Sequence, residues 1–347
     1  MLTGVSDMAA SIQLINEADL NQAYRERIAP FWRQGEFSAF TGVDNIRINF
    51  ARFEHPKTPQ DPPREQEKKL VIVPGRCEGY LKYQELCYDF YHAGYDLYII
   101  DHRGQGISQR LLARPHKGHV ESFDHYSDDL QQFIRTIVKP NSHSKTYLLA
   151  HSMGAAISAR YLQRFDNEIT AAVFASPMIA INSGFIPSSL AKVLVKTGGA
   201  LNHTLGKSPW YFPGQGDYQP REFTGNPLMH SAVRYQKFID LYRDTPEIQL
   251  GGVTFRWLAE ALKTRHDIFR DLARLNTPLT VLQAGADTIV DNRAQDEFCH
   301  RLNRVFPASC PAGKPVKITR ARHELFFEAD EFRNPALSQA VSWFERF

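Results

Sequence analysis

Ser152 lies in a short sequence that suits a nucleophilic serine. An apolar run ends at Ala150 and leads directly into His151-Ser152-Met153-Gly154, after which small residues continue in a helical pattern. This spacing resembles the G-x-S-x-G turn between a strand and a helix, with Ala150 in place of the first glycine. Small residues are needed two positions before and after the serine because the strand and helix backbones pass close together there. The alternative is a buried serine that only caps an ordinary helix.

A serine hydroxyl becomes a strong nucleophile only when an imidazole accepts its proton and a carboxylate orients that imidazole. Two residues further along the chain fill these roles in the order serine, acid, histidine. Asp287 follows one apolar run and His323 follows the next, so both should lie at the carboxyl end of a strand. Asp291 is the nearest competing carboxylate. We expect His151 to pack beside the serine without taking part in the chemistry.

Two backbone N–H groups are expected to stabilise the negative charge that develops on the carbonyl oxygen during acyl transfer. One is the amide of Met153, directly after the serine. The other is the amide of Arg76, in the loop Pro74-Gly75-Arg76-Cys77-Glu78-Gly79. The alternative is that this loop only turns the chain, and Cys77 is interpreted as a small apolar filler. Chemistry of this kind needs no metal and no organic cofactor.

Short β-branched runs alternate with helix-length segments from Leu70 onward. Such runs predict strands buried on both faces, and the segments between them are long enough for the crossover helices that parallel strands require. The predicted strands are 70–73, 97–100, 146–149, 171–174, 279–283 and 316–318, and the predicted helices are 80–93, 123–138, 152–165 and 292–302. Ahead of them, alternation at Ile46, Ile48 and Phe50 predicts an antiparallel entry hairpin. The fold class is therefore α/β, a doubly wound and mostly parallel sheet with helices on both faces.

About a hundred residues separate the fourth predicted strand from the fifth, which is too long for a structureless loop. Helical patterns at 188–196, 230–244 and 254–275 predict an inserted, mainly helical cap over the carboxyl edge of the sheet. The predicted organisation is an N-terminal helical extension at 1–36, a core at 37–177 and 277–347, and a cap at 178–276.

The composition excludes several classes of protein. The 347 residues are 43% hydrophobic and 23% charged, which is typical of a globular enzyme and not of collagen, a coiled coil or a disordered chain. Forty-one Lys and Arg against 38 Asp and Glu leave a net charge of +3, too small a surplus to predict nucleic-acid binding. Four cysteines without a C-x-x-C pair predict neither a disulfide framework nor a zinc site. The sequence does not indicate an oligomeric state.

The N-terminal sequence lacks the features of an export signal, because the first basic residue is Arg25 and acidic residues precede it. The longest apolar stretch, 171–181, is broken by Ser176 and Pro177 and is far shorter than the roughly 20 residues that span a bilayer. We expect a cytoplasmic protein with reduced thiols. Any contact with a membrane would be peripheral, at the inner face of the cell membrane.

Five motifs together resemble one branch of the α/β-hydrolase superfamily, which contains monoacylglycerol lipases and lysophospholipase L2 and has a serine aminopeptidase S33-type domain. The motifs are Val71 to Gly75, Asp101 to Ser108, Ala150 to Gly154, Gly285-Ala286-Asp287 and Ala321-Arg322-His323-Glu324. The resemblance extends from Phe37 to the C-terminus. Two positions depart from the pattern of this branch, since Pro74 replaces the usual histidine and Ala150 the usual glycine.

The resemblance implies the α/β-hydrolase fold and a serine hydrolase that cleaves the carboxylic ester of a lysophospholipid or a monoacylglycerol through an acyl-enzyme. The partner would be a lipid or a small ester. Acyl transfer between lysophospholipids, or a broad carboxylesterase activity, would use the same site chemistry. A non-catalytic lipid-binding protein is a rival from another class, and it predicts damage to at least one of the three positions Ser152, Asp287 and His323.

Substrate contacts are expected from two regions. Trp210, Tyr211 and Phe212 of the predicted cap would line an acyl tunnel, with packing inside the cap as an equal alternative. Arg103 lies in a locally basic loop that would suit a phosphate headgroup or an anionic membrane surface. The alternative for this loop is an ordinary solvated face.

Overall fold

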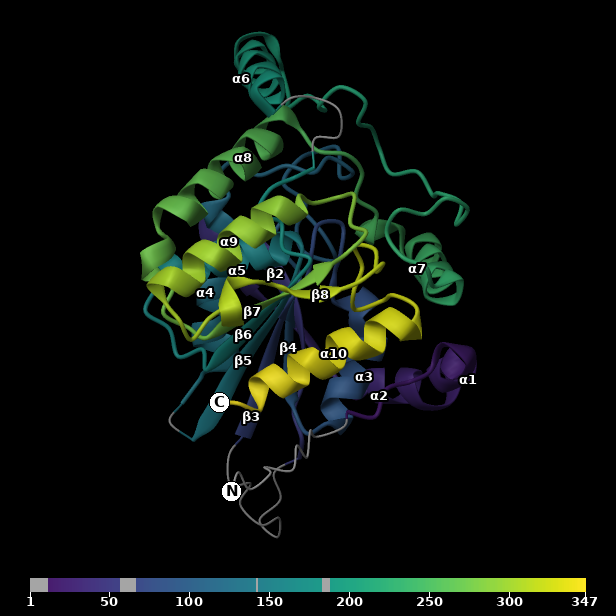
Figure 1. Ribbon diagram of the computed structural model, residues 1–347. Coiled ribbons are helices and arrows are strands. Elements are labelled where there is room, and N and C mark those ends of the chain that lie inside the picture. Colours follow the sequence, from purple (N-terminus) through teal and green to yellow (C-terminus); the bar gives the residue numbers. More distant parts are fainter. Residues whose placement is uncertain (1–11, 57–66, 142, 183–187) are drawn as a thin grey trace.

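The computed structural model describes residues 12–56, 67–141, 143–182 and 188–347. In this part of the chain an eight-stranded sheet runs through the middle of the molecule, in the order β1-β2-β4-β3-β5-β6-β7-β8 (Figure 1). The strands are β1 (Glu36–Thr41), β2 (Arg47–Phe53), β3 (Glu67–Val73), β4 (Asp96–Ile100), β5 (Ser144–His151), β6 (Ala171–Ala175), β7 (Leu279–Ala284) and β8 (Val316–Ile318). β2 pairs antiparallel with both β1 and β4, and the neighbours from β4 to β8 are parallel.

The central strands are buried along most of their length, because their β-branched and aliphatic residues pack against helices on both faces. The predicted α/β class and the antiparallel entry hairpin are confirmed. Since β3 to β8 run in parallel, the loops that follow them meet at one edge of the sheet. That edge is where Ser152, Asp287 and His323 were expected.

Two apolar clusters hold the helices on the sheet. The first packs α4 (Asp124–Phe133), α5 (Met153–Arg164), α8 (Phe255–Arg270) and α9 (Asn292–Val305) against one face. The second packs α2 (Ala29–Trp32), α3 (Gln84–His92) and α10 (Asp330–Phe344) against the other. Figure 1 shows α9 and α10 on opposite sides of the sheet. The fold is therefore a three-layer α/β structure with a core on each side of the sheet.

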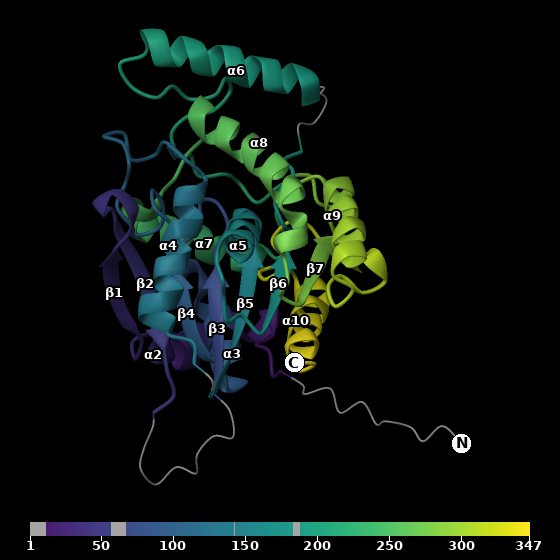
Figure 2. The ribbon, with the colours of Figure 1, turned by 90° about the vertical axis from the view of Figure 1, so that its left-hand side faces the viewer.

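The interval between β6 and β7 contains α6 (Ser188–Leu205), α7 (Ala232–Asp244) and α8. We call residues 178–276 the cap segment, and the domain boundaries that define it stay a prediction. α6 forms an outer layer beyond α8 (Figure 2). The two helices approach closely at Gly198, where a Cβ would lie 2.2 Å from the Phe255 ring. Among the described residues, no helix is both long and apolar enough to cross a membrane.

The N-terminal segment, with α1 (Leu20–Ala23) and α2, is held against the core by buried charges. The backbone N–H of Ile15 donates to Asp89 at 3.3 Å, and that of Glu17 donates to Asp330 at 2.7 Å. Both carboxylates belong to a group of buried and partly buried ion pairs that links α3, α7 and α10. We call this group the anchor network; its members are Glu85, Asp89, Arg234, Asp330 and Arg333.

Candidate active site

Ser152 stands at the turn where β5 ends and α5 begins. Its backbone has φ 50° and ψ −115°, a combination that a residue with a side chain adopts only under strain. The surrounding backbone enforces this conformation: the Ser152 N–H donates to the Ala175 carbonyl at 3.0 Å, and the Ser152 carbonyl accepts from the Met178 N–H at 3.0 Å. A strained serine fixed in this way is the geometry of the strand-turn-helix motif that the sequence indicated.

Gly154 shows why the turn requires a small residue two positions after the serine. A Cβ at this position would lie 2.2 Å from the carbonyl oxygen of Val73 and 2.4 Å from that of Pro74. The start of α5 therefore rests directly on the end of β3. Met153 is the first residue of α5, so its N–H has no partner within the helix and can serve a ligand.

The three residues predicted to act together form a chain of two hydrogen bonds with His323 in the middle. His323 Nε2 is 3.0 Å from Ser152 Oγ, and His323 Nδ1 is 2.7 Å from Asp287 Oδ2. Ser152 and His323 are only 7% and 4% exposed, so little water competes for this chain of hydrogen bonds. The three side chains come from the loops after β5, β7 and β8, which meet at the carboxyl edge of the sheet.

Asp287 is held in the form that suits an orienting carboxylate. Burial alone would raise its pKa, but the hydrogen bond and charge of His323 and the amides of Ile289 and Val290 lower the pKa below its usual value. These amides donate to Oδ1 at 2.7 and 3.1 Å, leaving Oδ2 for the imidazole. The competing carboxylate Asp291 has another task, since it caps α9 by accepting the Arg293 N–H.

The loop after β3 is fixed from three directions. Gln105 donates to the carbonyls of Gly75 and Glu78 at 2.7 and 2.8 Å. The Tyr242 hydroxyl of the cap segment donates to the Cys77 carbonyl at 2.9 Å. The Arg76 guanidinium donates to the carbonyl of Gly251, which is also in the cap segment. These contacts set the position of the turn at Gly75 and Arg76. The role of the Arg76 and Met153 amides toward an oxyanion stays a prediction.

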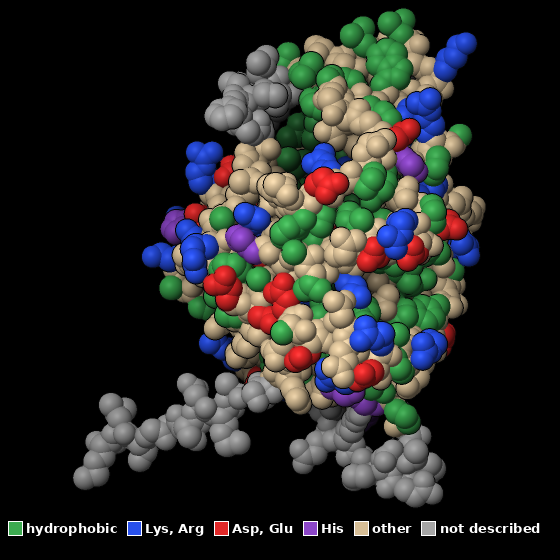
Figure 3. Space-filling model, turned by 90° about the vertical axis from the view of Figure 1, so that its right-hand side faces the viewer, with side chains coloured by type: hydrophobic (Ala, Val, Ile, Leu, Met, Phe, Trp, Pro, Cys, Tyr) green, Lys and Arg blue, Asp and Glu red, His purple; other side chains and the backbone are tan. Residues whose placement is uncertain are grey.

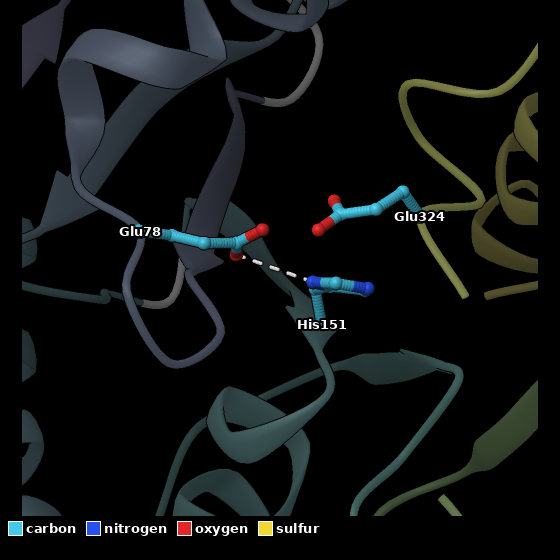
Figure 4. A group of neighbouring side chains, drawn as sticks. All are labelled: Glu78, His151 and Glu324. Carbon is cyan, nitrogen blue, oxygen red and sulfur yellow. Dashed lines mark hydrogen bonds and ion pairs between the residues drawn. The ribbon is translucent and has the colours of Figure 1, made fainter. Parts of the chain in front are cut away.

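Sequence reasoning missed a group of four buried ionisable side chains behind Ser152, which we call the buried quartet: Glu78, Lys82, His151 and Glu324. Figure 4 shows three of them converging, Glu78 and Glu324 from two loops and His151 from the end of β5. The ligand atoms of Glu78, His151 and Glu324 lie within 4.8 Å of one another, a spacing that would suit a metal ion. However, the ammonium of Lys82 lies 2.6 Å from Glu78 and 2.8 Å from Glu324 and supplies the positive charge there. The one signal in the sequence was the i, i+4 spacing of Glu78 and Lys82.

The expected substrate-binding residues lie in different surroundings. Arg103 is buried, and its guanidinium donates to both carboxylate oxygens of Asp129 at 2.7 and 2.9 Å. In the cap segment, Trp210 is 40% exposed, the Tyr211 hydroxyl donates to Asp217, and Phe212 packs edge-on against the Phe255 ring. Substrate contact by these four residues stays a prediction.

One face of the molecule is hollowed below the outer helix of the cap segment. Figure 3 shows hydrophobic side chains gathered at the top of this face and a hollow beneath them with hydrophobic side chains inside. The exposed apolar residues of the cap segment include Val193, Leu201, Leu205 and Trp210. Exposed apolar surface beside a hollow is typical of sites that receive an apolar ligand or a lipid surface.

The strand order, the helices on both faces and the serine at the β5–α5 turn define an α/β-hydrolase. The family described as serine aminopeptidase, S33, matches residues 64–330, and this chain belongs to that family. The predicted fold and family are thereby confirmed.

Relatives of known name agree with this assignment. The chain is 39% identical over 319 residues to lysophospholipase L2 of Escherichia coli, covering 92% of this chain and 90% of the relative. It is 35% identical over 325 residues to the probable lysophospholipase L2 of Haemophilus influenzae, covering 93% and 96%. A solved structure, a soluble variant of monoglyceride lipase from Saccharomyces cerevisiae in complex with a substrate analog, superposes with a TM-score of 0.65 at 17% identity, covering 90% and 94%, and shows likeness of fold alone. The chain is an ester hydrolase, as predicted.

Proposed function

We propose that this chain hydrolyses the carboxylic ester of a lysophospholipid or a monoacylglycerol through an acyl-enzyme on Ser152. The observation that carries the proposal is the continuous hydrogen-bonded chain from Ser152 through His323 to Asp287 at a strained turn. The choice of lipid rests on the names of the relatives, lysophospholipase L2 and monoglyceride lipase. The apolar hollow and the exposed apolar side chains of the cap segment support an acyl chain as ligand.

The mechanism proceeds in two halves. Ser152 Oγ attacks the ester carbonyl carbon while His323 Nε2 accepts the hydroxyl proton, and His323 then delivers that proton to the leaving alcohol as the C–O bond breaks. In the second half, His323 takes a proton from water, the hydroxide adds to the acyl carbon, and the proton returns to Ser152 as the fatty acid leaves. Asp287 keeps the imidazole oriented and stabilises its charged form.

The amides of Met153 and Arg76 are proposed to stabilise the oxyanion in both halves. Each donor of this kind contributes about 3 to 4 kcal/mol to the transition state. Met153 suits the role because its N–H begins α5, and Arg76 because the contacts of its loop fix the backbone.

We also propose that the protein is cytoplasmic and meets its substrate at the inner face of a membrane. α6 contains two lysines and no Asp or Glu, and it exposes Val193, Leu201 and Leu205. An apolar helix face flanked by positive charge favours contact with anionic lipid from one side. Sedimentation with anionic vesicles, compared between the wild type and a Leu201→Asp/Leu205→Asp variant, tests this, and equal sedimentation would contradict it.

The function is tested with a panel of lysophospholipids, monoacylglycerols, diacyl phospholipids and short p-nitrophenyl esters. Release of free fatty acid from the single-chain lipids, absent in Ser152→Ala, is the expected result. An added phosphatidylglycerol acceptor separates hydrolysis from transfer, because transfer would produce an acylated acceptor in place of fatty acid. Cleavage of short esters alone, with the single-chain lipids untouched, would contradict the proposed substrate class.

A further inference from the structure

The buried quartet places two positive and two negative charges in one closed group. Glu78 Oε1 and Glu324 Oε2 both accept from Lys82, and Glu78 Oε2 lies 3.2 Å from His151 Nδ1. All four residues are less than 8% exposed. Buried charges are tolerated when each is paired and hydrogen-bonded, and this group meets that condition with a net charge of zero.

The partners of His151 determine its protonation. Its Nδ1 faces the carboxylate of Glu78, and its Nε2 lies 3.2 Å from the backbone carbonyl oxygen of His323. Both partner atoms are acceptors only, so both ring nitrogens must carry a proton, which makes the ring an imidazolium. Burial would lower the pKa of His151, but the nearby carboxylates of Glu78 and Glu324 raise it to about 9 against the opposing charge of Lys82.

The quartet also reaches the backbone of both sides of the proposed active site. Glu78 Oε2 accepts the Gly75 N–H at 2.5 Å, in the turn that presents the Arg76 amide. On the other side, the His323 carbonyl accepts from His151 and from the Ser176 hydroxyl at 2.8 Å. Gly75 allows this close assembly, because a Cβ there would lie 2.9 Å from Glu78 and 3.0 Å from His151.

We infer that Glu78 and His151 are positioning residues of the proposed active site, and this inference rests on the proposed function. The Glu78 carboxylate fixes the oxyanion turn, and the His151 imidazolium, donating with both ring nitrogens, ties that turn to the backbone of His323. Lys82 and Glu324 keep the buried group neutral. The quartet therefore sets the distance between the oxyanion donors and the base without touching the substrate.

The first test is Glu78→Gln, which keeps the shape of the side chain and removes its charge. Glu78 accepts from Gly75, Lys82 and His151, and also from the Tyr83 hydroxyl at 2.7 Å. A glutamine cannot accept from all four groups together, so the turn should move. A displacement of this size is expected to lower kcat about 100-fold while KM changes less than about twofold. A folded Glu78→Gln protein with kcat within about threefold of wild type would overturn the inference.

Glu85→Gln is the matched control. Glu85 is equally buried and is also paired, but its partners are Arg234 and Arg333 in the anchor network. We expect a lower melting temperature with kcat unchanged. A fall in kcat as large as that of Glu78→Gln would show a general effect of buried charge and would overturn the assignment of a positioning role.

The double variant Glu78→Gln/Lys82→Met separates positioning from charge balance. It removes one charge of each sign, and a methionine suits the rings of Phe238 and Phe327 that now surround the ammonium. We expect its melting temperature to recover toward wild type while kcat stays low, because the Gly75 N–H still lacks its carboxylate. Recovery of kcat together with stability would overturn the inference.

A spectroscopic test needs no substrate. Nitrogen-15 NMR of the histidine rings, with His151→Gln used for assignment, should show His151 protonated at both nitrogens near neutral pH and neutral in Glu78→Gln. A neutral His151 ring in the wild type would overturn the inference. If the wild type fails to hydrolyse any ester, the proposed function falls, while this measurement still decides the state of the quartet.

Discussion

Two groups of buried charges, the quartet and the anchor network, use the same physical chemistry for different ends. In the quartet, the Glu78 carboxylate accepts from the Gly75 N–H, and the His151 ring donates to the His323 carbonyl. Both backbone groups belong to loops of the proposed active site. In the anchor network, Arg234 donates to Glu85, Asp330 and the Glu328 carbonyl, joining α3, α7 and α10. A buried ion pair therefore does not by itself indicate a functional site.

The two groups differ in the backbone N–H groups that their carboxylates accept. Asp89 and Asp330 accept the N–H groups of Ile15 and Glu17, so the anchor network fixes the N-terminal segment. Glu78 instead accepts the N–H of Gly75, next to the proposed oxyanion donor. We therefore expect changes at Ser152 and Asp287 to lower the rate with little loss of stability, Glu78→Gln to lower both, and changes in the anchor network to lower stability alone.

Ser152→Ala should give the largest effect on the site side of this comparison. Removing the nucleophile is expected to lower kcat at least about 10⁴-fold, with the melting temperature at or above that of wild type. Stopped assays of fatty acid release measure the rate. Ser158→Ala is the control. Ser158 is a buried serine of α5, and the variant should retain full activity.

Asp287→Asn should follow, with kcat lowered about 10³- to 10⁴-fold because an amide no longer selects the required tautomer of His323. Since Asp287 also accepts two backbone N–H groups, which the amide oxygen can still receive, stability should change little. Steady-state kinetics with one lysophospholipid gives the rate. Activity close to that of wild type would mean that another carboxylate orients the imidazole.

Arg234→Met should show the opposite behaviour. It removes the closer of the two cations from buried Glu85 and the cation of the partly exposed Asp330, which is expected to lower the free energy of unfolding by about 3 kcal/mol. Urea titration measures that loss, and kcat of the folded protein should stay at the wild-type level. Arg243→Ala, which removes an exposed arginine of the same helix, should leave stability unchanged. A fall in kcat for Arg234→Met would break the separation between the two groups.

Asp291→Ala should have the smallest effect. Loss of the cap of α9 is expected to destabilise the protein by about 1 kcal/mol, with no change in kcat. Thermal unfolding measures the loss of stability, and the fatty acid assay measures kcat. Loss of activity here, with activity retained in Asp287→Asn, would reverse the assignment of the orienting carboxylate.

Local signals in the sequence were sufficient for the parallel part of the sheet and for the three residues of the hydrogen-bonded chain, whereas the edge strand β1 was not predicted. Ser152, Asp287 and His323 each follow a strand that reads as a short apolar run, and parallel strands bring their ends together. The quartet had no comparable signal, because 73 residues separate Glu78 from His151 and 242 separate Lys82 from Glu324. Only the folded chain brings them together.

Two further features depended on tertiary contacts. Arg103 was considered for headgroup binding because basic residues surround it in the sequence, but a charge count does not reveal a buried partner such as Asp129. A helical pattern was predicted at 188–196, whereas α6 continues to Leu205 through Gly198 and Gly199. Packing explains Gly198, since only a residue without a side chain fits against Phe255.

Direct identification of the acylated residue tests the central proposal. The protein is mixed with a p-nitrophenyl ester of a fatty acid, quenched with acid during turnover, digested, and analysed by mass spectrometry. We predict the added acyl mass on the peptide containing Ser152 and its absence in Ser152→Ala. An acyl group on Cys77, or full turnover with no acylated peptide, would contradict the account.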